Sequence, residues 1–162
     1  MPAELFVDTS AWYPIAVRNH PEHAPLAAAL GERVRAGVRV VTTNLVIAES
    51  HALLLHRVHT GAALAFVRTV RQRPHLVVTS SPELEAAAIA EWLERFEDQG
   101  FSFTDAVSFA VMSSRGIAEA LTLDAHFATA GFRAIPHATY PRARPRDYHL
   151  RERTRAAATR QV

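Results

Sequence analysis

The chain has 162 residues, 49% of them hydrophobic and 21% charged, which suits a single domain with a full hydrophobic core. Cysteine and lysine are both absent, so disulfides, thiolate zinc sites, Schiff-base chemistry and a lysine-dependent phosphate loop are excluded. No apolar run approaches the roughly 20 residues of a membrane span. The first ten residues lack the layout of a signal peptide, so we expect a cytoplasmic protein without membrane association.

The 18 basic residues are all arginines, and they are spread unevenly. Residues 1–140 carry 11 arginines and 14 acidic residues, whereas residues 141–162 carry seven arginines and two acidic residues. We therefore predict a folded domain at residues 1–137 and an arginine-rich extension at residues 138–162. Such an extension is typical of contact with a polyanion, of an arm folded over an acidic face, or of a solvated tail.

Short apolar runs alternate with helical patterns along the chain. The apolar runs predict five strands, at residues 4–8, 38–41, 75–79, 120–123 and 132–135. Apolar residues spaced three and four apart predict helices, at residues 12–16, 24–35, 45–58, 62–71, 82–96, 104–115 and 125–131. This alternation predicts an α/β fold, Rossmann-like, with a five-stranded parallel sheet and helices on both faces.

Two of the predicted helices have an inner face that can be read from the spacing. We expect Leu45, Ala48, Ala52 and Leu55 to face inward in one helix, and Leu64, Val67 and Val70 in the next. Ser102 and Thr104 are alternative caps for the helix at residues 104–115, and either choice places Asp105 in its first turn.

Four carboxylates occupy positions that a parallel sheet brings to one edge. Asp8 and Asp124 each end a predicted strand, Asp105 opens a helix, and Glu49 lies inside the helix that follows the second strand. The carboxyl ends of parallel strands and the helix N-termini that follow them share one edge of the sheet. Each acid alone also fits a turn, a cap or an exposed helix position. Their coincidence predicts instead one shared pocket.

Such a pocket needs a cation, because buried like charges repel one another. Oxygen ligands favour Mg²⁺ or Mn²⁺, and a bound divalent ion makes hydroxide available for phosphodiester hydrolysis. The sequence does not distinguish one ion from two. Thr9 and Ser10 are positioned to orient a carboxylate or a water, and His126 is positioned either to touch a phosphate or to pack. The other histidines fit surface or capping roles.

These motifs resemble those of PIN-domain ribonucleases, and most closely the VapC-like toxins of bacterial type II toxin–antitoxin pairs. The resemblance spans about residues 4–136. The matching residues are Asp8-Thr9-Ser10, Glu49, Thr104-Asp105-Ala106 and Asp124-Ala125-His126-Phe127.

The resemblance implies a PIN-like five-stranded parallel sheet, a Mg²⁺ or Mn²⁺ site, and endonucleolytic cleavage of single-stranded RNA. It also implies a homodimer and a cognate antitoxin that blocks the active site. By resemblance, the catalytic, metal-binding acids are Asp8, Glu49, Asp105 and Asp124. The supporting polar residues are Thr9, Ser10 and Thr104.

Other classes fit less well. A receiver-like phosphoacceptor domain expects paired acids after the first strand and a nearby lysine, and a haloacid-dehalogenase-like phosphatase expects an aspartate where Ser10 stands. A catalytically inactive PIN-like module that binds RNA or protein, and a housekeeping RNA-processing nuclease, stay as alternatives. Transfer, ribosomal and messenger RNA are all candidate targets. The possible base-stacking aromatics, Trp12, Tyr13, Phe101 and Phe103, are interpreted first as core residues.

Overall fold

The structure is a computed structural model that describes residues 3–136. Its centre is one five-stranded, fully parallel sheet in the order β3-β2-β1-β4-β5. The strands are β1 (Glu4–Val7), β2 (Arg39–Thr43), β3 (His75–Val78), β4 (Glu119–Leu121) and β5 (Arg133–Ile135). The predicted number and parallel direction of the strands are confirmed, and their order in the sheet comes from the structure.

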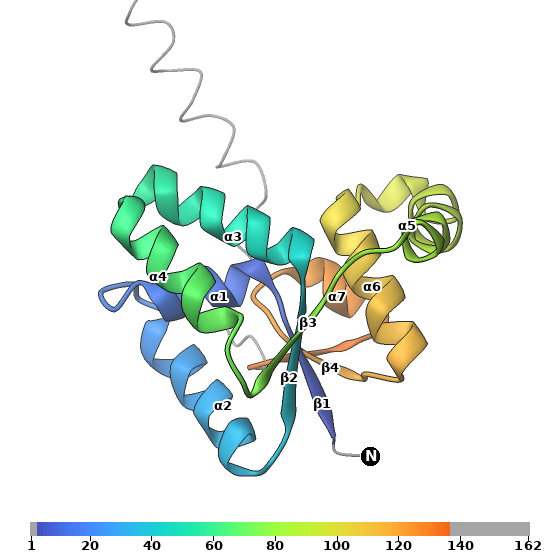
Figure 1. Cartoon of the computed structure of the whole chain (residues 1–162). Coiled ribbons are helices and arrows are strands. Elements are labelled where there is room, and N and C mark those ends of the chain that lie inside the picture. Colours follow the sequence, from blue (N-terminus) through green and yellow to red (C-terminus); the bar gives the residue numbers. More distant parts are fainter. Residues whose placement is uncertain (1–2, 137–162) are drawn as a thin grey trace, which may run out of the picture.

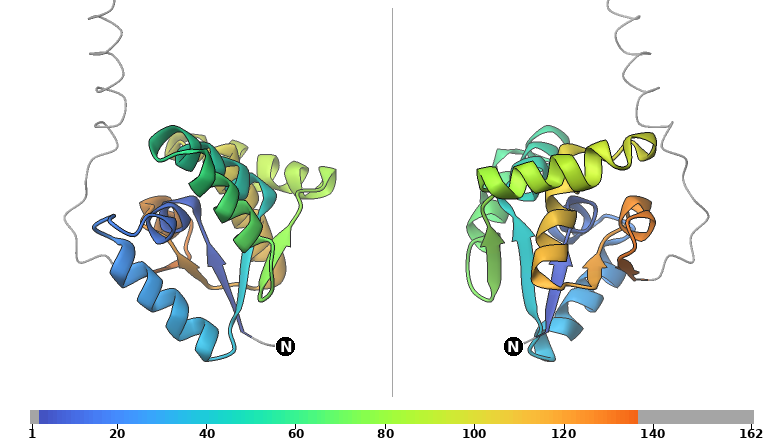
Figure 2. Two further views of the ribbon diagram at one scale, coloured as in Figure 1. Left: turned by 60° about the vertical axis from the view of Figure 1, so that its left-hand side comes forward. Right: turned by 90° about the vertical axis from the view of Figure 1, so that its right-hand side faces the viewer.

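Helices cover both faces of the sheet (Figure 1). The α-helices are α1 (Thr9–Ala16), α2 (His23–Arg35), α3 (Asn44–Arg57), α4 (Thr60–Val70), α5 (Pro82–Ala88), α6 (Phe103–Arg115) and α7 (Ala125–Thr129). The first four lie on one side of the strands and the last three on the other, and the right-hand view of Figure 2 shows α5 and α6 in front of the sheet. The fold class is therefore α/β with helices on both faces, as predicted.

The direction of strand addition reverses at β1, and this reversal creates the site. From β1 the chain adds β2 and β3 on one side, then crosses over to add β4 and β5 on the other. Phe6 pairs with Ala120 and Val7 with Leu121, so β1 and β4 end side by side. Open parallel sheets hold their functional groups beyond the strand ends at such a switch point.

The inner face of α3 differs from the prediction. The buried residues of this helix are Val46, Ile47, Ser50 and Leu54, whereas Ala48, Ala52 and Leu55 are exposed. Leu45 is half-buried and packs on a small second cluster instead. One residue of error in phase rotates a helix by about 100°. The apolar residues on both sides of α3 made either face compatible with the spacing.

The next helices show two smaller differences. In α4 the buried residues are Ala63, Phe66 and Val70, while Leu64 is 46% exposed. The predicted single helix at residues 82–96 begins as expected at Ser81, whose side chain accepts from Leu84 N. It then changes into a π-helical turn, η1 (Ile89–Glu94), and is followed by a short 3-10 turn, η2 (Glu97–Gln99).

The described residues do not include the predicted arginine-rich extension at residues 138–162, so that prediction lies outside the described part of the chain. Within residues 3–136, no helix combines the length and apolar character needed to cross a membrane.

Candidate metal centre

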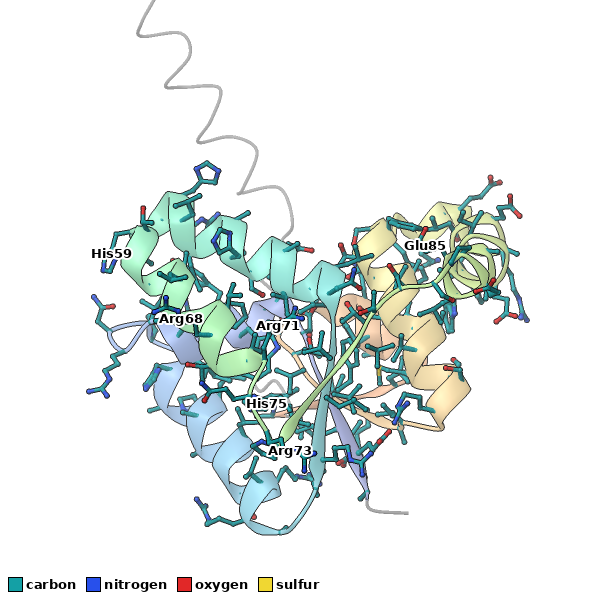
Figure 3. All side chains as sticks on the ribbon, in the orientation of Figure 1. His59, Arg68, Arg71, Arg73, His75 and Glu85 are labelled. Carbon is teal, nitrogen blue, oxygen red and sulfur yellow. The ribbon has the colours of Figure 1, made fainter. Side chains whose placement is uncertain are left out.

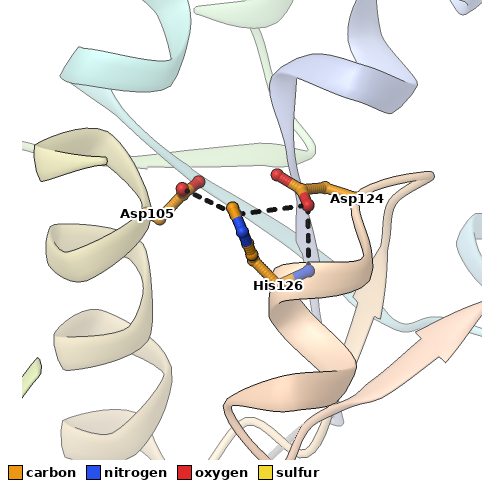
Figure 4. Close-up of side chains that lie close together, drawn as sticks. All are labelled: Asp105, Asp124 and His126. Carbon is orange, nitrogen blue, oxygen red and sulfur yellow. Dashed lines mark hydrogen bonds and ion pairs between the residues drawn. The ribbon is translucent and has the colours of Figure 1, made fainter. Parts of the chain in front are cut away.

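Two aspartates and a histidine meet beyond the ends of β1 and β4 (Figure 4). His126 Nδ1 lies 3.5 Å from Asp105 Oδ2 and 3.5 Å from Asp124 Oδ1. One ligand atom from each of these three residues lies within 4.8 Å of the others. The structure therefore brings together two of the predicted acids and the histidine that sequence alone left between two roles.

Local backbone chemistry fixes both aspartates. Ser102 caps α6: its hydroxyl accepts from Asp105 N at 3.0 Å, and Ser102 N donates to Asp105 Oδ2 at 3.0 Å. This reciprocal pair is a capping box, so Ser102 rather than Thr104 begins the helix. Asp124 caps α7 by accepting from His126 N at 2.9 Å. Both aspartates are therefore helix caps as well as members of this cluster.

Asp8 lies deeper, at the end of β1, and only 4% of it is exposed. It caps α1, because its Oδ2 accepts from Ser10 N at 3.1 Å. The same oxygen accepts from Ser10 Oγ at 2.8 Å and from Thr122 Oγ1 at 3.2 Å. Ser10 therefore holds the Asp8 carboxylate in place, and its predicted role in catalysis stays a prediction.

Thr122 is the polar residue of this site that the sequence analysis missed. It is 2% exposed, and besides donating to Asp8 its hydroxyl accepts from Asp124 N at 2.9 Å. One hydroxyl thus positions the acids that follow two different strands. A signal was present in the sequence, since Thr122 directly precedes Leu123-Asp124 at a strand end, but only the pairing of β1 with β4 reveals its partner.

Glu49 approaches the same pocket from α3, and its side chain lies at the solvent side of the acids. Burial raises its pKa, a hydrogen bond with Thr104 lowers it, and the charges of Asp105 and Asp124 raise it again. Thr104 thus contacts Glu49, and its predicted supporting role stays a prediction.

The carboxyl groups of the pocket have raised pKa values, because burial and mutual repulsion disfavour their negative charge. Burial raises the pKa of Asp8 to about 6, against the lowering effect of its Ser10 hydrogen bonds, and the charge of Asp124 adds to the rise. Burial also raises the pKa of Asp124, whose nearest favourable contacts come from His126, while the Asp105 charge opposes them. A cation bound among these carboxylates would offset both the burial and the repulsion that raise their pKa values.

Thr9 contacts Asp8 through its backbone N–H, which lowers the pKa of that carboxyl, but its side chain turns elsewhere. Its hydroxyl donates to the Val46 carbonyl oxygen at 3.5 Å, and the side chain packs α1 against α3. Thr9 follows Asp8 directly, but the first turn of α1 carries the side chains of Thr9 and Ser10 to different sides of the helix. Only Ser10 turns toward β4.

The donor set fits a divalent cation. The Nδ1 atom of His126 is buried and has no hydrogen-bond partner among the described residues, although it faces two carboxylates. A buried polar atom without a partner costs about 1–3 kcal/mol, so its retention indicates a ligand or an ion pair. Carboxylate oxygens with one imidazole nitrogen are suitable ligands for a divalent metal.

Comparisons with known proteins agree with this geometry. The family model described as "PIN domain" matches residues 5–133. The chain belongs to the PIN-domain family. Within that family it is 35% identical, over 132 residues, to the 23S rRNA-specific endonuclease VapC20 of Mycobacterium tuberculosis, an alignment that covers 79% of this chain and 95% of VapC20.

Solved structures show the same relationship. The crystal structure of Mycobacterium tuberculosis VapC20, a sarcin–ricin loop cleaving toxin, has a TM-score of 0.69 at 34% identity and covers 79% of this chain and 95% of its own. The Pyrobaculum aerophilum protein PAE2754, at 23% identity and a TM-score of 0.54, covers 83% of this chain and 91% of its own and shows the shared fold alone. The predicted family, a VapC-like PIN-domain ribonuclease, is confirmed.

Proposed function

We propose that this protein is a divalent-metal-dependent endoribonuclease that cuts single-stranded regions of RNA, and that it is the toxin of a type II toxin–antitoxin pair. The observation that carries the proposal is the convergence of Asp105, Asp124 and His126 within 4.8 Å beside buried Asp8. A fold shared with an RNA-cleaving toxin supports the substrate class.

The metal, Mg²⁺ or Mn²⁺, would be held by Asp8, Asp105 and Asp124, with Glu49 at the rim. When bound, such an ion lowers the pKa of a coordinated water and offsets charge on the phosphate. The backbone bonds engage Oδ2 of Asp105 and Oδ1 of Asp124, so the second oxygen of each carboxylate is free for the ion. His126 adds a nitrogen donor, or a positive charge when protonated, at the centre of the group.

Charge is divided between two consecutive stretches of the chain. Residues 50–82 contain four arginines and no acid, whereas residues 83–98 contain six acids and one arginine. In Figure 3 the labelled Arg68, Arg71 and Arg73 lie on the α4–β3 side, and Glu85 lies on the α5 side. The three arginines are exposed, and within residues 3–136 none of them has an ion-pair partner. This side is suited to phosphate groups of RNA.

The relatives indicate which substrate and which partner to test first. VapC20 is named as a 23S ribosomal RNA-specific endonuclease and as a toxin that cleaves the sarcin–ricin loop. The same loop is the first substrate to test for this chain, with transfer and messenger RNA as the comparison. An antitoxin that covers the acidic pocket is the expected partner, and a homodimer is the expected assembly.

The decisive experiment incubates purified protein with ribosomal RNA and with a short RNA carrying the sarcin–ricin loop, with and without added Mg²⁺ or Mn²⁺. We expect site-specific cleavage that needs the metal and is lost in Asp105→Asn, whose circular dichroism spectrum stays that of the wild type. Metal-independent cleavage, or full activity of Asp105→Asn, would refute the proposal. Growth arrest on expression, relieved by the neighbouring antitoxin, tests the toxin role.

A further inference from the structure

Phe103 is an exception among the phenylalanines of this chain. All eight lie in the described residues, and Phe103 is the one that is exposed, with 41% of its surface accessible. It stands two residues before Asp105 and one before Thr104, at the first position of α6. By contrast, Trp12 and Phe101, also considered as base-stacking candidates, are 4% and 9% exposed and belong to the core.

The packing around α6 shows where this ring lies. One turn further along the helix, Val107 belongs to a small apolar cluster with Ala106 and Ala110, against which Leu45 of α3 and Leu84 of α5 pack. Residues four apart lie above one another on a helix. Phe103 therefore lies above Val107 on the side of α6 that meets α3 and α5, whereas Asp105, two positions on, leaves the helix on a different side.

We propose that Phe103 is a base-stacking platform that positions a nucleotide of the RNA next to the phosphate to be cut. The inference rests on the proposed ribonuclease function and adds to it a residue that sets the substrate register. An exposed aromatic ring in the first turn of the helix that carries Asp105 loses contact with water when an unpaired base stacks on it. Single-stranded RNA is recognised largely by such stacking, because unpaired bases offer their flat faces.

Leu123 is a second apolar residue at the mouth of the pocket. It is 39% exposed and directly precedes Asp124, on the β4 side of the acids, whereas Phe103 is on the α6 side. Its backbone N–H donates to Ser10 Oγ at 2.8 Å, which fixes the loop that carries it. Two exposed apolar residues thus stand within two positions of an acid of the site on two different segments, and Phe103 is the aromatic one.

The test combines variants of Phe103 with RNA substrates that lack one base. Cleavage of a short single-stranded RNA is measured for wild type, Phe103→Ala, Phe103→Trp and Phe103→Leu, with an abasic nucleotide placed at each position around the cut. Leu64→Ala serves as the matched control, because Leu64 is equally exposed, at 46%, but lies on α4. Metal affinity of each variant is measured by calorimetry without RNA.

We expect Phe103→Ala to lower kcat/KM by about ten-fold or more, mainly through KM. Phe103→Trp should retain activity, Phe103→Leu should recover only part, and Leu64→Ala and all metal affinities should be unchanged. At one abasic position, we expect wild-type cleavage to fall by about the same factor as the Phe103→Ala substitution causes on the intact RNA. Combining Phe103→Ala with that abasic RNA should cause little further loss, because both changes remove the same stacking contact.

Other results would overturn the inference in recognisable ways. Equal cleavage by wild type and Phe103→Ala, or losses that add at every abasic position, would refute the stacking role and leave the ribonuclease function intact. A loss of antitoxin binding with unchanged cleavage would assign Phe103 to the protein partner instead. If wild type cuts none of the RNAs, the proposed function fails, and this inference fails with it.

Discussion

The hydroxyl oxygens of Ser10 and Thr122 lie 3.0 Å apart, and both donate to the same oxygen of Asp8. Each also accepts a backbone N–H from the β4–α7 loop: Leu123 N donates to Ser10 Oγ and Asp124 N donates to Thr122 Oγ1. The pair therefore ties the end of β1 to the loop that carries Asp124. The separation of the buried acids is set by these two hydroxyls rather than by the acids themselves.

Removing one of these hydroxyls should loosen the site without unfolding the protein. Thr122→Val keeps the side-chain shape but removes the donor to Asp8 and the acceptor for Asp124 N. We expect metal affinity and RNA cleavage to fall by about 10- to 100-fold, whereas Thr122→Ser should retain most of both.

Thr42→Val is the matched control for this prediction, because Thr42 is also buried at a strand end. Its hydroxyl donates to the Val7 carbonyl oxygen and accepts from Trp12 Nε1, so it touches the backbone beside Asp8 but bonds to no acidic side chain. The control should lower the free energy of unfolding and leave metal affinity unchanged. If both variants bind metal like wild type, Thr122 has no positioning role.

Neutralising the most buried acid should stabilise the metal-free protein. The Asp8 carboxylate is 4% exposed, and burial raises its pKa to about 6 from 3.8. Asp8→Asn keeps an oxygen that can accept from Ser10 and Thr122. At pH 7.5 and without metal, we expect the free energy of unfolding to rise by up to about 3 kcal/mol, while cleavage is lost.

Chemical denaturation with excess chelator measures this effect, and Glu97→Gln, at an exposed position, should change nothing. Saturating metal should remove the advantage of Asp8→Asn, because the wild type gains binding energy that the variant does not. A variant less stable than wild type in chelator would show that the Asp8 charge is already satisfied by the protein.

Metal binding should strengthen as the pH rises through the pKa of Asp8. The folded protein holds this proton more tightly than the unfolded chain, so the carboxyl group stabilises the metal-free fold below pH 3.8 and loses that contribution as the pH rises through about 6. A metal must displace the proton. We expect Mn²⁺ affinity to rise and proton release to fall between about pH 5 and pH 7.

Calorimetry in two buffers of different ionisation enthalpy measures both quantities. In Asp8→Asn the pH dependence should be weaker, because Glu49 and Asp124, whose pKa values are also raised by burial, are then the groups that still titrate. The same steep dependence in wild type and variant would assign the proton to another group.

The arginines of the α4–β3 side should control how salt weakens RNA binding. For single strands, each phosphate contact contributes about 0.7 to the slope of log affinity against log salt concentration. The double variant Arg68→Gln, Arg71→Gln should therefore lower the slope by about 1.4. Arg35→Gln, which changes an exposed arginine at the end of α2, is the control. An unchanged slope in the double variant would place the RNA elsewhere.

The sequence by itself determined the features that depend only on residues adjacent in the chain. The alternation of strands and helices, the cap at Ser81, and the positions of Asp8 and Asp124 at strand ends are local properties, and the structure agrees with them. Convergence of the acids also followed, because parallel strands must end at one edge.

Only the tertiary structure decided which groups touch. Thr122 meets Asp8 across 114 positions because β4 pairs with β1, and nothing local to either residue specifies that pairing. The inner face of α3 was wrong in the prediction because a helix with apolar residues on several sides is oriented by its neighbours. Phe101 is buried and Phe103 exposed for the same reason: burial is decided by what packs against a side chain, and that comes from distant parts of the chain.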